Sequence, residues 1–363
     1  MERQSSRAEF TKWEYKVEYH YSSFRGNVDG MLGNGYDIFL TYSNYGLREI
    51  RMRLPNGMPF PKRVWSQYIT EGLEWTADKS GKAGILRLSP YLDDGYDPRW
   101  DFEEGLDAAA KLREMLITGD LRALYVLWLC TSMASRYDDE PVMEPPVPHG
   151  LDTFPRDAAG LLGFFEADGL LVDAAAIGIP GFDAQGARGD LVQAWLTTVS
   201  DSRRNEIIQR LVTDDPVVVK AELLAEIRDS QQAVTWPVEP PKRTLAQLLQ
   251  ECELLRQKED EKQRKQAAAQ AKRDAAKAEK QRQARMAEMK AAPESWLRKT
   301  SELVEARGTA NYREAASILA DLRDALGGTE GNTIARKHAA HLVKSHPTLT
   351  VLKSSLRQGG LLD

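Results

Sequence analysis

The sequence predicts an α+β protein with an N-terminal antiparallel β-meander packed with helices, followed by a long charged helix and a C-terminal helical bundle. Between residues 12 and 92, apolar and polar side chains alternate with a period of two, as in half-buried strands. From residue 102 onward, apolar residues recur at helical spacing instead. Residues 242–292 contain neither Gly nor Pro and hold 14 Lys/Arg against 8 Asp/Glu. These patterns divide the chain into four parts. They are an α+β domain with the antiparallel sheet (1–140), a helical domain (141–235), a Pro-rich linker with the long charged helix (236–293), and a small helical bundle (294–363).

The predicted meander has about five strands, a usual sheet size. A first strand covers Trp13–Tyr21, where aromatic residues and Val17 alternate with charged ones. Two hairpins follow, joined by strings of turn-forming residues. Their strands are Asp37–Tyr42 with Leu47–Leu54, and Leu73–Ala77 with Ile85–Leu88.

Side-chain alternation within 49–54 assigns each residue to a face of the sheet. Three apolar residues fall on the inner face and three charged residues on the outer face, in the order Glu49, Ile50, Arg51, Met52, Arg53, Leu54. The glycines at 26, 30, 33 and 35 predict a loop before the first hairpin.

The helical pattern begins with Phe102–Ile117 and Leu121–Tyr137, and Asp120 is placed as the N-cap of the second helix. That second helix is almost entirely apolar, which predicts that it is buried. An acidic, Pro-rich connector at 138–148 precedes several short helices. We expect these near Arg156–Glu166, Leu170–Ile177, Leu191–Val199, Arg203–Leu211 and Val217–Ser230.

The long helix has an apolar stripe only at its start. Leu245, Leu248, Leu249, Cys252 and Leu255 recur at helical spacing, so this part docks on a core. After Leu255 the large apolar residues stop until Met286 and Met289. About 50 residues at 1.5 Å per residue give roughly 75 Å. Apolar heptads are absent, so a two-stranded coiled coil is not predicted.

Residues 294–363 predict a separate bundle of four helices, Trp296–Arg307, Tyr312–Leu326, Thr333–Ser345 and Thr348–Leu356. Within it, His338 and His341 share a helix face, but the spacing of a metal-binding helix is absent and no thiol lies nearby. We expect a mildly basic helix there and assign no metal site and no cofactor to the chain.

Composition favours a protein of a reducing compartment. Only Cys130 and Cys252 are present, the N-terminus lacks an apolar signal core, and no apolar run is long enough to span a membrane. We therefore expect a cytoplasmic protein with no membrane partner. The net charge of −5 conceals a dipolar layout, because 137–183 carry ten acids and one base whereas 242–292 are net basic.

The bases of the long helix are the strongest binding candidates. Lysine and arginine along a rod can neutralise phosphates and release counterions. The candidate nucleic-acid contacts are Arg264, Lys265, Lys272, Arg273, Lys280, Arg282 and Arg285. Acids such as Glu261 and Asp274 weaken this field, so a solvated spacer or a rod that binds a protein partner is the favoured interpretation.

A catalytic interpretation depends on Asp37, Glu49 and Arg51. Their order resembles superficially the acidic pair and lysine of restriction-like nucleases, in which two carboxylates hold Mg²⁺. Arginine replaces the lysine here, the spacing comes from a simple hairpin, and the order of flanking helices differs. An ion pair between Glu49 and Arg51 or a cross-strand neighbour is the simpler prediction.

The sequence thus favours a non-catalytic interaction or adaptor protein whose long charged helix spaces or docks partners in a larger assembly. A nucleic-acid-associated factor that binds phosphates through the basic helix is the first alternative. A metal-dependent enzyme in the N-terminal domain is the second.

Overall fold

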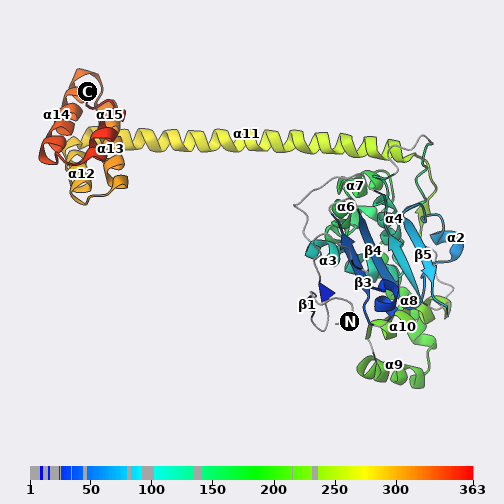
Figure 1. The fold of residues 1–363 in the computed structure, drawn as a ribbon. Helices are drawn as coiled ribbons and strands as arrows, with labels where there is room; N and C mark the ends of the chain where they lie inside the picture. Colours follow the sequence, from blue (N-terminus) through cyan, green and yellow to red (C-terminus); the bar gives the residue numbers. More distant parts are fainter. Residues whose placement is uncertain are drawn as a thin grey trace. The chain divides into compact units, whose positions relative to one another are not determined.

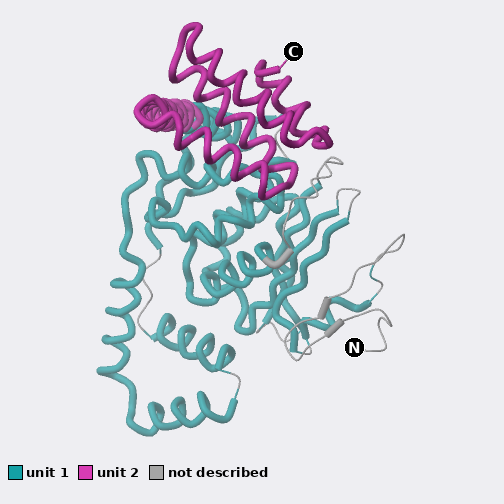
Figure 2. Tube along the Cα trace, turned by 90° about the vertical axis from the view of Figure 1, so that its left-hand side faces the viewer, with its two compact units in different colours: residues 1–259 teal, residues 260–363 magenta. Residues whose placement is uncertain are grey.

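A computed structural model gives the architecture of the chain (Figure 1). It describes residues 9–10, 15–16, 24, 26–33, 35–43, 47–79, 83–91, 102–134, 140–214, 216–230 and 236–362. The chain forms two compact units, Met1–Glu259 and Asp260–Asp363 (Figure 2). This division falls inside the long helix, whereas the sequence pattern places boundaries at 140, 235 and 293.

The α+β prediction is confirmed, and unit 1 is built on a four-stranded antiparallel sheet. Its strands are β3 (Ile38–Tyr42), β4 (Arg48–Leu54), β5 (Leu73–Ala77) and β6 (Gly84–Leu88). Ile50, Met52 and Leu54 are buried on the inner face, as alternation requires. A separate two-stranded ladder pairs β1 (Glu9–Phe10) with β2 (Tyr15–Lys16). The rest of the predicted strand Trp13–Tyr21 lies outside the described residues.

The strand order is β3-β4-β6-β5, so the sheet is not a simple meander. Both predicted hairpins form, but β6 lies between β4 and β5. The burial of the two strands explains the order, because β6 buries Gly84, Leu86 and Leu88, whereas β5 exposes Glu74 and Thr76. The more polar strand takes the edge. A connection with the short helix α2 (Lys62–Trp65) carries the chain to that edge.

The glycine-rich stretch before the first hairpin is not the predicted loop. It holds a short helix, α1 (Val28–Gly33), in which Met31 and Leu32 are buried. The side chain of Asn27 accepts a hydrogen bond from the amide of Gly30 at 2.9 Å and so satisfies a donor of the first turn. Burial of two apolar side chains and this cap outweigh the low helix propensity of glycine.

Two helices cover the inner face of the sheet (Figure 1). The first, α3, spans Phe102–Ile117 as predicted. The second, α4, spans Leu121–Leu129 and ends earlier than predicted. Every residue of α4 is buried, and its N-cap is Asp120, which accepts from the amide of Arg122 at 3.1 Å. Both predictions about this helix, burial and cap, are confirmed.

Shorter elements complete unit 1. The first group packs into the same core as α4 and consists of η1 (Leu151–Thr153), α5 (Arg156–Ala159), α6 (Leu161–Phe164) and α7 (Leu170–Ala176). A small core of its own, formed by Trp195, Ile207, Val219 and Ile227, joins three further helices. These are α8 (Ala184–Thr198), α9 (Asp201–Thr213) and α10 (Pro216–Ser230). Strand β7 (Val147–Pro148) pairs with β8 (Val238–Glu239) directly before the long helix.

The long helix, α11, runs from Leu245 to Ala291 without a break, 47 residues in all. Leu245, Leu248 and Cys252 are buried in the core of unit 1, which confirms that its start docks. Near its end, Met289 is buried with Ile318 and Leu322 of unit 2.

Unit 2 continues with α12 (Pro293–Glu305), α13 (Thr309–Leu326), α14 (Gly328–Ser345) and α15 (Thr350–Gln358). Their core includes Val304, Tyr312, Leu319, Leu342, Leu352 and Leu356. Pro293 opens α12, a position where its missing N–H costs no hydrogen bond. The predicted four-helix bundle is therefore present.

Candidate functional site

The candidate functional site is the exposed part of α11. Every residue from Arg256 to Arg285 is exposed, a run of 30 residues that we call the exposed segment. It consists only of Lys, Arg, Asp, Glu, Gln and Ala, with 11 bases and 5 acids. A helix that is polar all round has no apolar face to bury against a core. The segment is therefore available to solvent, to a partner or to a ligand.

The predicted nucleic-acid contacts do not share one side of this helix. At about 100° per residue, Lys265, Lys272, Arg273 and Lys280 fall within one arc of about 100°. Arg264 and Arg282 project from the other side, roughly 160° from Lys280. Four of the seven predicted contacts can thus meet one surface together, and two cannot join them there.

The last predicted contact, Arg285, is held within unit 2. Its guanidinium pairs with Asp321 at 3.2 Å and lies over the ring of Trp296, 5.7 Å from the ring centre. A cation that is stacked and paired in this way gives up those contacts when it binds phosphate. Arg285 stabilises the junction of α11 with α12 and α13.

Within unit 2, two lysines missing from the predicted set complete the basic side. Lys262 and Lys277 lie in or at the edge of the same arc, which widens to about 140°. We call the six residues the basic face: Lys262, Lys265, Lys272, Arg273, Lys277 and Lys280. A helical projection of the sequence shows that these six bases share one side of the helix, whereas their order along the chain does not.

The acids of unit 2's part of the exposed segment leave the basic face nearly unpaired. Asp274 accepts from Gln270 at 3.1 Å and Glu279 accepts from Gln283 at 2.9 Å. Among the described residues, one base of this face forms an ion pair: Lys265 pairs with Glu261 at 2.6 Å. Neutral Gln and Ala fill the rest of the arc, so the positive charge is not cancelled within it.

A buried ion pair fixes the start of α11 to unit 1. Arg243, two residues before the helix, donates to Glu144 through Nε at 2.6 Å and Nη2 at 3.0 Å. The same guanidinium donates to the carbonyl oxygens of Ala174 and Ala175 at the end of α7, where the helix dipole favours a cation. Glu144 also accepts from the hydroxyl of Tyr125 on α4. Burial and the charge of Glu144 raise the pKa of that hydroxyl well above its ordinary value.

About three turns into α11, the acidic region of 137–183 meets the basic helix directly. Asp168 pairs with Arg256, and Cys252 lies beside the same carboxylate. Burial, and then Asp168, raise the pKa of the Cys252 thiol to about 12. Burial also raises the pKa of Cys130. Neither thiol therefore has the thiolate character of a nucleophile.

Glu49 and Arg51 lie on the outer side of the sheet, and Asp37 does not form one cluster with them. Glu49 is 5% exposed and accepts from Arg51 at 2.6 Å and from Arg87 of β6 at 2.6 Å. Asp37 pairs instead with Arg113 of α3 at 2.6 Å. The predicted Glu49–Arg51 pair is thus present, and arginines occupy both carboxylates. Catalysis by these residues stays an untested alternative.

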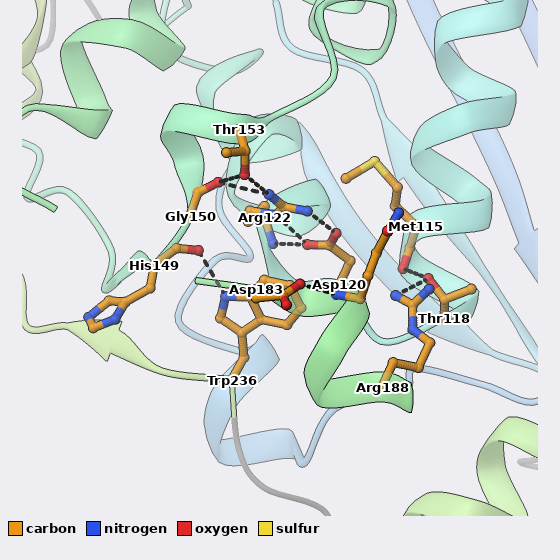
Figure 3. A network of polar contacts seen from close by, with 11 residues as sticks. Met115, Thr118, Asp120, Arg122, His149, Gly150, Thr153, Asp183, Arg188 and Trp236 are labelled. Carbon is orange, nitrogen blue, oxygen red and sulfur yellow. Dashed lines mark hydrogen bonds and ion pairs between the residues drawn. The ribbon is translucent and has the colours of Figure 1, made fainter. Parts of the chain in front are cut away.

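A second buried network surrounds Arg122 (Figure 3). Arg122 is 7% exposed and forms a two-bond ion pair with Asp120, at 2.9 Å and 2.7 Å. It also donates to the carbonyl oxygen of Gly150 at 2.8 Å and lies 5.3 Å from the ring centre of Trp236. Gly150 has φ 77°, which favours glycine. These polar groups satisfy one another, so the network is structural rather than a ligand site.

No group of three or more His, Cys, Asp or Glu able to hold a metal occurs in the described part of the chain. In unit 2, His338 instead bonds Thr300 Oγ1 at 3.0 Å, with the His341 ring centre 6.3 Å away. The acidic residues 93–101 lie outside the described residues.

None of the helices described here is both long enough and apolar enough to cross a bilayer.

Comparison with protein-family models, with curated proteins and with solved structures finds no match for this chain. Function is therefore inferred from the residues of the chain and their geometry.

Proposed function

We propose that this is a cytoplasmic, non-catalytic adaptor whose long charged helix spaces protein partners in a larger assembly. The observation that supports the proposal is the exposed segment, 30 residues of unbroken helix without a large apolar side chain. A helix of this composition gains nothing from burial, and its alanines, glutamines and charges favour helix without tertiary support. A helix that retains such a long solvated stretch suits the role of a connector between folded parts.

The two units supply surfaces on which protein partners can bind. Each has its own apolar core, so each can present a rigid surface. On α9 of unit 1, Ile208 is 62% exposed and Val212 is 83% exposed, on the same side of the helix at i and i+4. Exposed apolar side chains of this kind are common at protein interfaces.

Capture of partners from the native host tests the proposal. A deletion of the whole helix would also remove Leu245 and Leu248, which are buried in the core of unit 1. Deletion of the 18 residues 262–279 avoids this, and at about 100° per residue it keeps the two ends in rotational phase. The matched control replaces 262–279 by an 18-residue helix of Ala, Gln and balanced Glu/Lys pairs.

An adaptor that acts by spacing retains its joint partners in the length-matched replacement and loses them in the deletion. These partners also remain after nuclease treatment of the lysate. If the full chain captures no nuclease-resistant protein that the deletion loses, the adaptor proposal fails.

A further inference from the structure

We infer that the basic face of α11 binds the phosphate backbone of double-stranded nucleic acid without regard to base sequence. The inference goes beyond the adaptor role, because it concerns a different class of partner and can be measured on the purified protein alone. It rests on the arrangement of Lys262, Lys265, Lys272, Arg273, Lys277 and Lys280 in unit 2.

The charge of the basic face is concentrated on one side of the helix. Its six bases fall in an arc of about 140°, and no acid between Lys262 and Lys280 falls within it. The acids of that stretch, Asp274 and Glu279, are engaged by glutamines. Five of the six bases form no ion pair among the described residues, and all six are exposed. A one-sided cationic surface attracts a polyanion that approaches from that side.

The spacing of the bases is of the same order as that of a phosphate backbone. Lys262 to Lys280 spans about 27 Å at 1.5 Å per residue, so the five intervals between the six cations average roughly 5.4 Å. One strand of a double helix presents a phosphate every 3.4 Å or so along its axis. A straight rod whose cations are mostly unpaired among the described residues can therefore contact several phosphates of a rigid duplex at once and release their counterions.

The absence of aromatic and large apolar residues from the exposed segment favours a duplex over a single strand or a protein as the ligand. The exposed segment contains no aromatic residue, so it cannot stack on unpaired bases, which is how proteins hold single strands. It also lacks the large apolar anchors that dominate the energy of protein interfaces. An acidic protein therefore gains less here than a duplex, whose binding needs charge alone.

Fluorescence anisotropy with a labelled 20-base-pair duplex tests the inference on the full chain. The variant Lys272→Gln/Lys280→Gln removes two charges from the basic face. Its matched control, Arg264→Gln/Arg282→Gln, removes two exposed charges from the other side of the same helix, neither of them in an ion pair with any residue that the structure describes. Glutamine is a good helix former, so both variants preserve α11. Circular dichroism checks this.

The expected result is a Kd that rises steeply with salt. Two lost phosphate contacts reduce the log–log salt slope by about 1.8 and weaken binding roughly 60-fold at 0.1 M salt. The control variant changes the Kd by less than about threefold, because its charges face away and are screened over about 10 Å. Duplex DNA and duplex RNA are measured in parallel to identify the source of the phosphates, and a single strand of the same sequence is expected to bind more weakly.

Three results would overturn the inference. The first is no duplex binding at 100 μM protein in 50 mM salt. The second is an equal loss of duplex affinity in both double variants, which would show that binding does not depend on the basic face. The third is displacement of the duplex by poly-glutamate as effectively as by unlabelled duplex at equal charge, which would assign the face to an acidic protein.

Discussion

Arg243 Nε lies 2.6 Å from Glu144 Oε2, and this pair joins the residues that precede α11 to a carboxylate that is 2% exposed. Around it, the amide of Glu144 donates to the carbonyl oxygen of Arg243 and the amide of Leu245 donates to that of Val142. A charge pair at this depth is stable only when its remaining hydrogen-bonding positions are also filled. Tyr125, Glu251 and the end of α7 fill them.

Removal of one partner of this pair is expected to destabilise unit 1. Arg243→Met leaves Glu144 buried without its cation and lowers the free energy of unfolding by about 3–5 kcal/mol. Urea denaturation followed by tryptophan fluorescence measures the change. Lys242→Met is the control, because the neighbouring Lys242 pairs with Glu239 at the surface. Similar midpoints in the two variants would show that the buried pair does not anchor α11.

Arg122→Met is expected to lower the stability of unit 1 to a comparable extent. The substitution leaves Asp120 buried and opposite an apolar side chain, at a cost of about 3–5 kcal/mol. Arg188→Met provides the comparison within the same network (Figure 3), because Arg188 donates to Thr118 Oγ1 at 3.1 Å and bridges no buried carboxylate. A wild-type melting temperature in Arg122→Met would contradict the structural role of this network.

Glu49→Gln distinguishes a structural carboxylate from a catalytic one. Since Glu49 accepts from two arginines, its neutralisation is expected to cost about 1–3 kcal/mol of stability. Differential scanning fluorimetry, with Glu74→Gln as an exposed control on the edge strand β5, checks this. Unchanged stability together with loss of a metal-dependent nuclease activity would instead favour the enzyme alternative.

The stability of unit 2 is expected to fall as the solution becomes acidic. Burial, and then the neighbouring His341, lower the pKa of His338 below its ordinary value of 6.5. The unfolded chain therefore binds a proton at a higher pH than the folded one, so the contribution of His338 is complete above pH 6.5 and is lost progressively below it. Thermal melts of the full chain between pH 7.5 and 5 measure this, and His338→Gln is expected to flatten the profile of unit 2. An unchanged profile in that variant would assign the pH dependence to other groups.

Local patterns in the sequence predict the elements of this fold well. Phe102–Ile117 agrees with α3 because helical periodicity, an N-terminal acidic region and a Gly-Asp stop coincide. The start of α11 docks where its leucine stripe lies, and Asp120 caps α4. Each of these features depends on residues within a few positions of one another.

Features set by distant residues are harder to predict. The order β3-β4-β6-β5 depends on how the strands pack against the rest of unit 1, which determines the strand at the edge of the sheet. Arg48 follows the alternation of Ile50 and Met52 to the inner side, where it is 4% exposed and pairs with Glu166, more than 100 residues away. In the sequence, Arg285 resembles the other exposed bases of the helix. Only the structure shows that Asp321 and Trp296 lie beside it. The basic face, by contrast, can be predicted from the sequence, because the helical period alone places its six bases on one side.

Amide hydrogen exchange across α11 in the purified full chain tests the central claim most directly. If the exposed segment is helical but packs on nothing, opening one of its turns costs only local helix energy, whereas opening α4 or α13 requires loss of a core. The amides of Gln266–Arg282 are then expected to exchange at least about 100-fold faster than those of α4 and α13, at both 1 μM and 50 μM protein. Protection of these amides equal to that of α4 would show that the segment is buried by packing or self-association and would contradict the connector account.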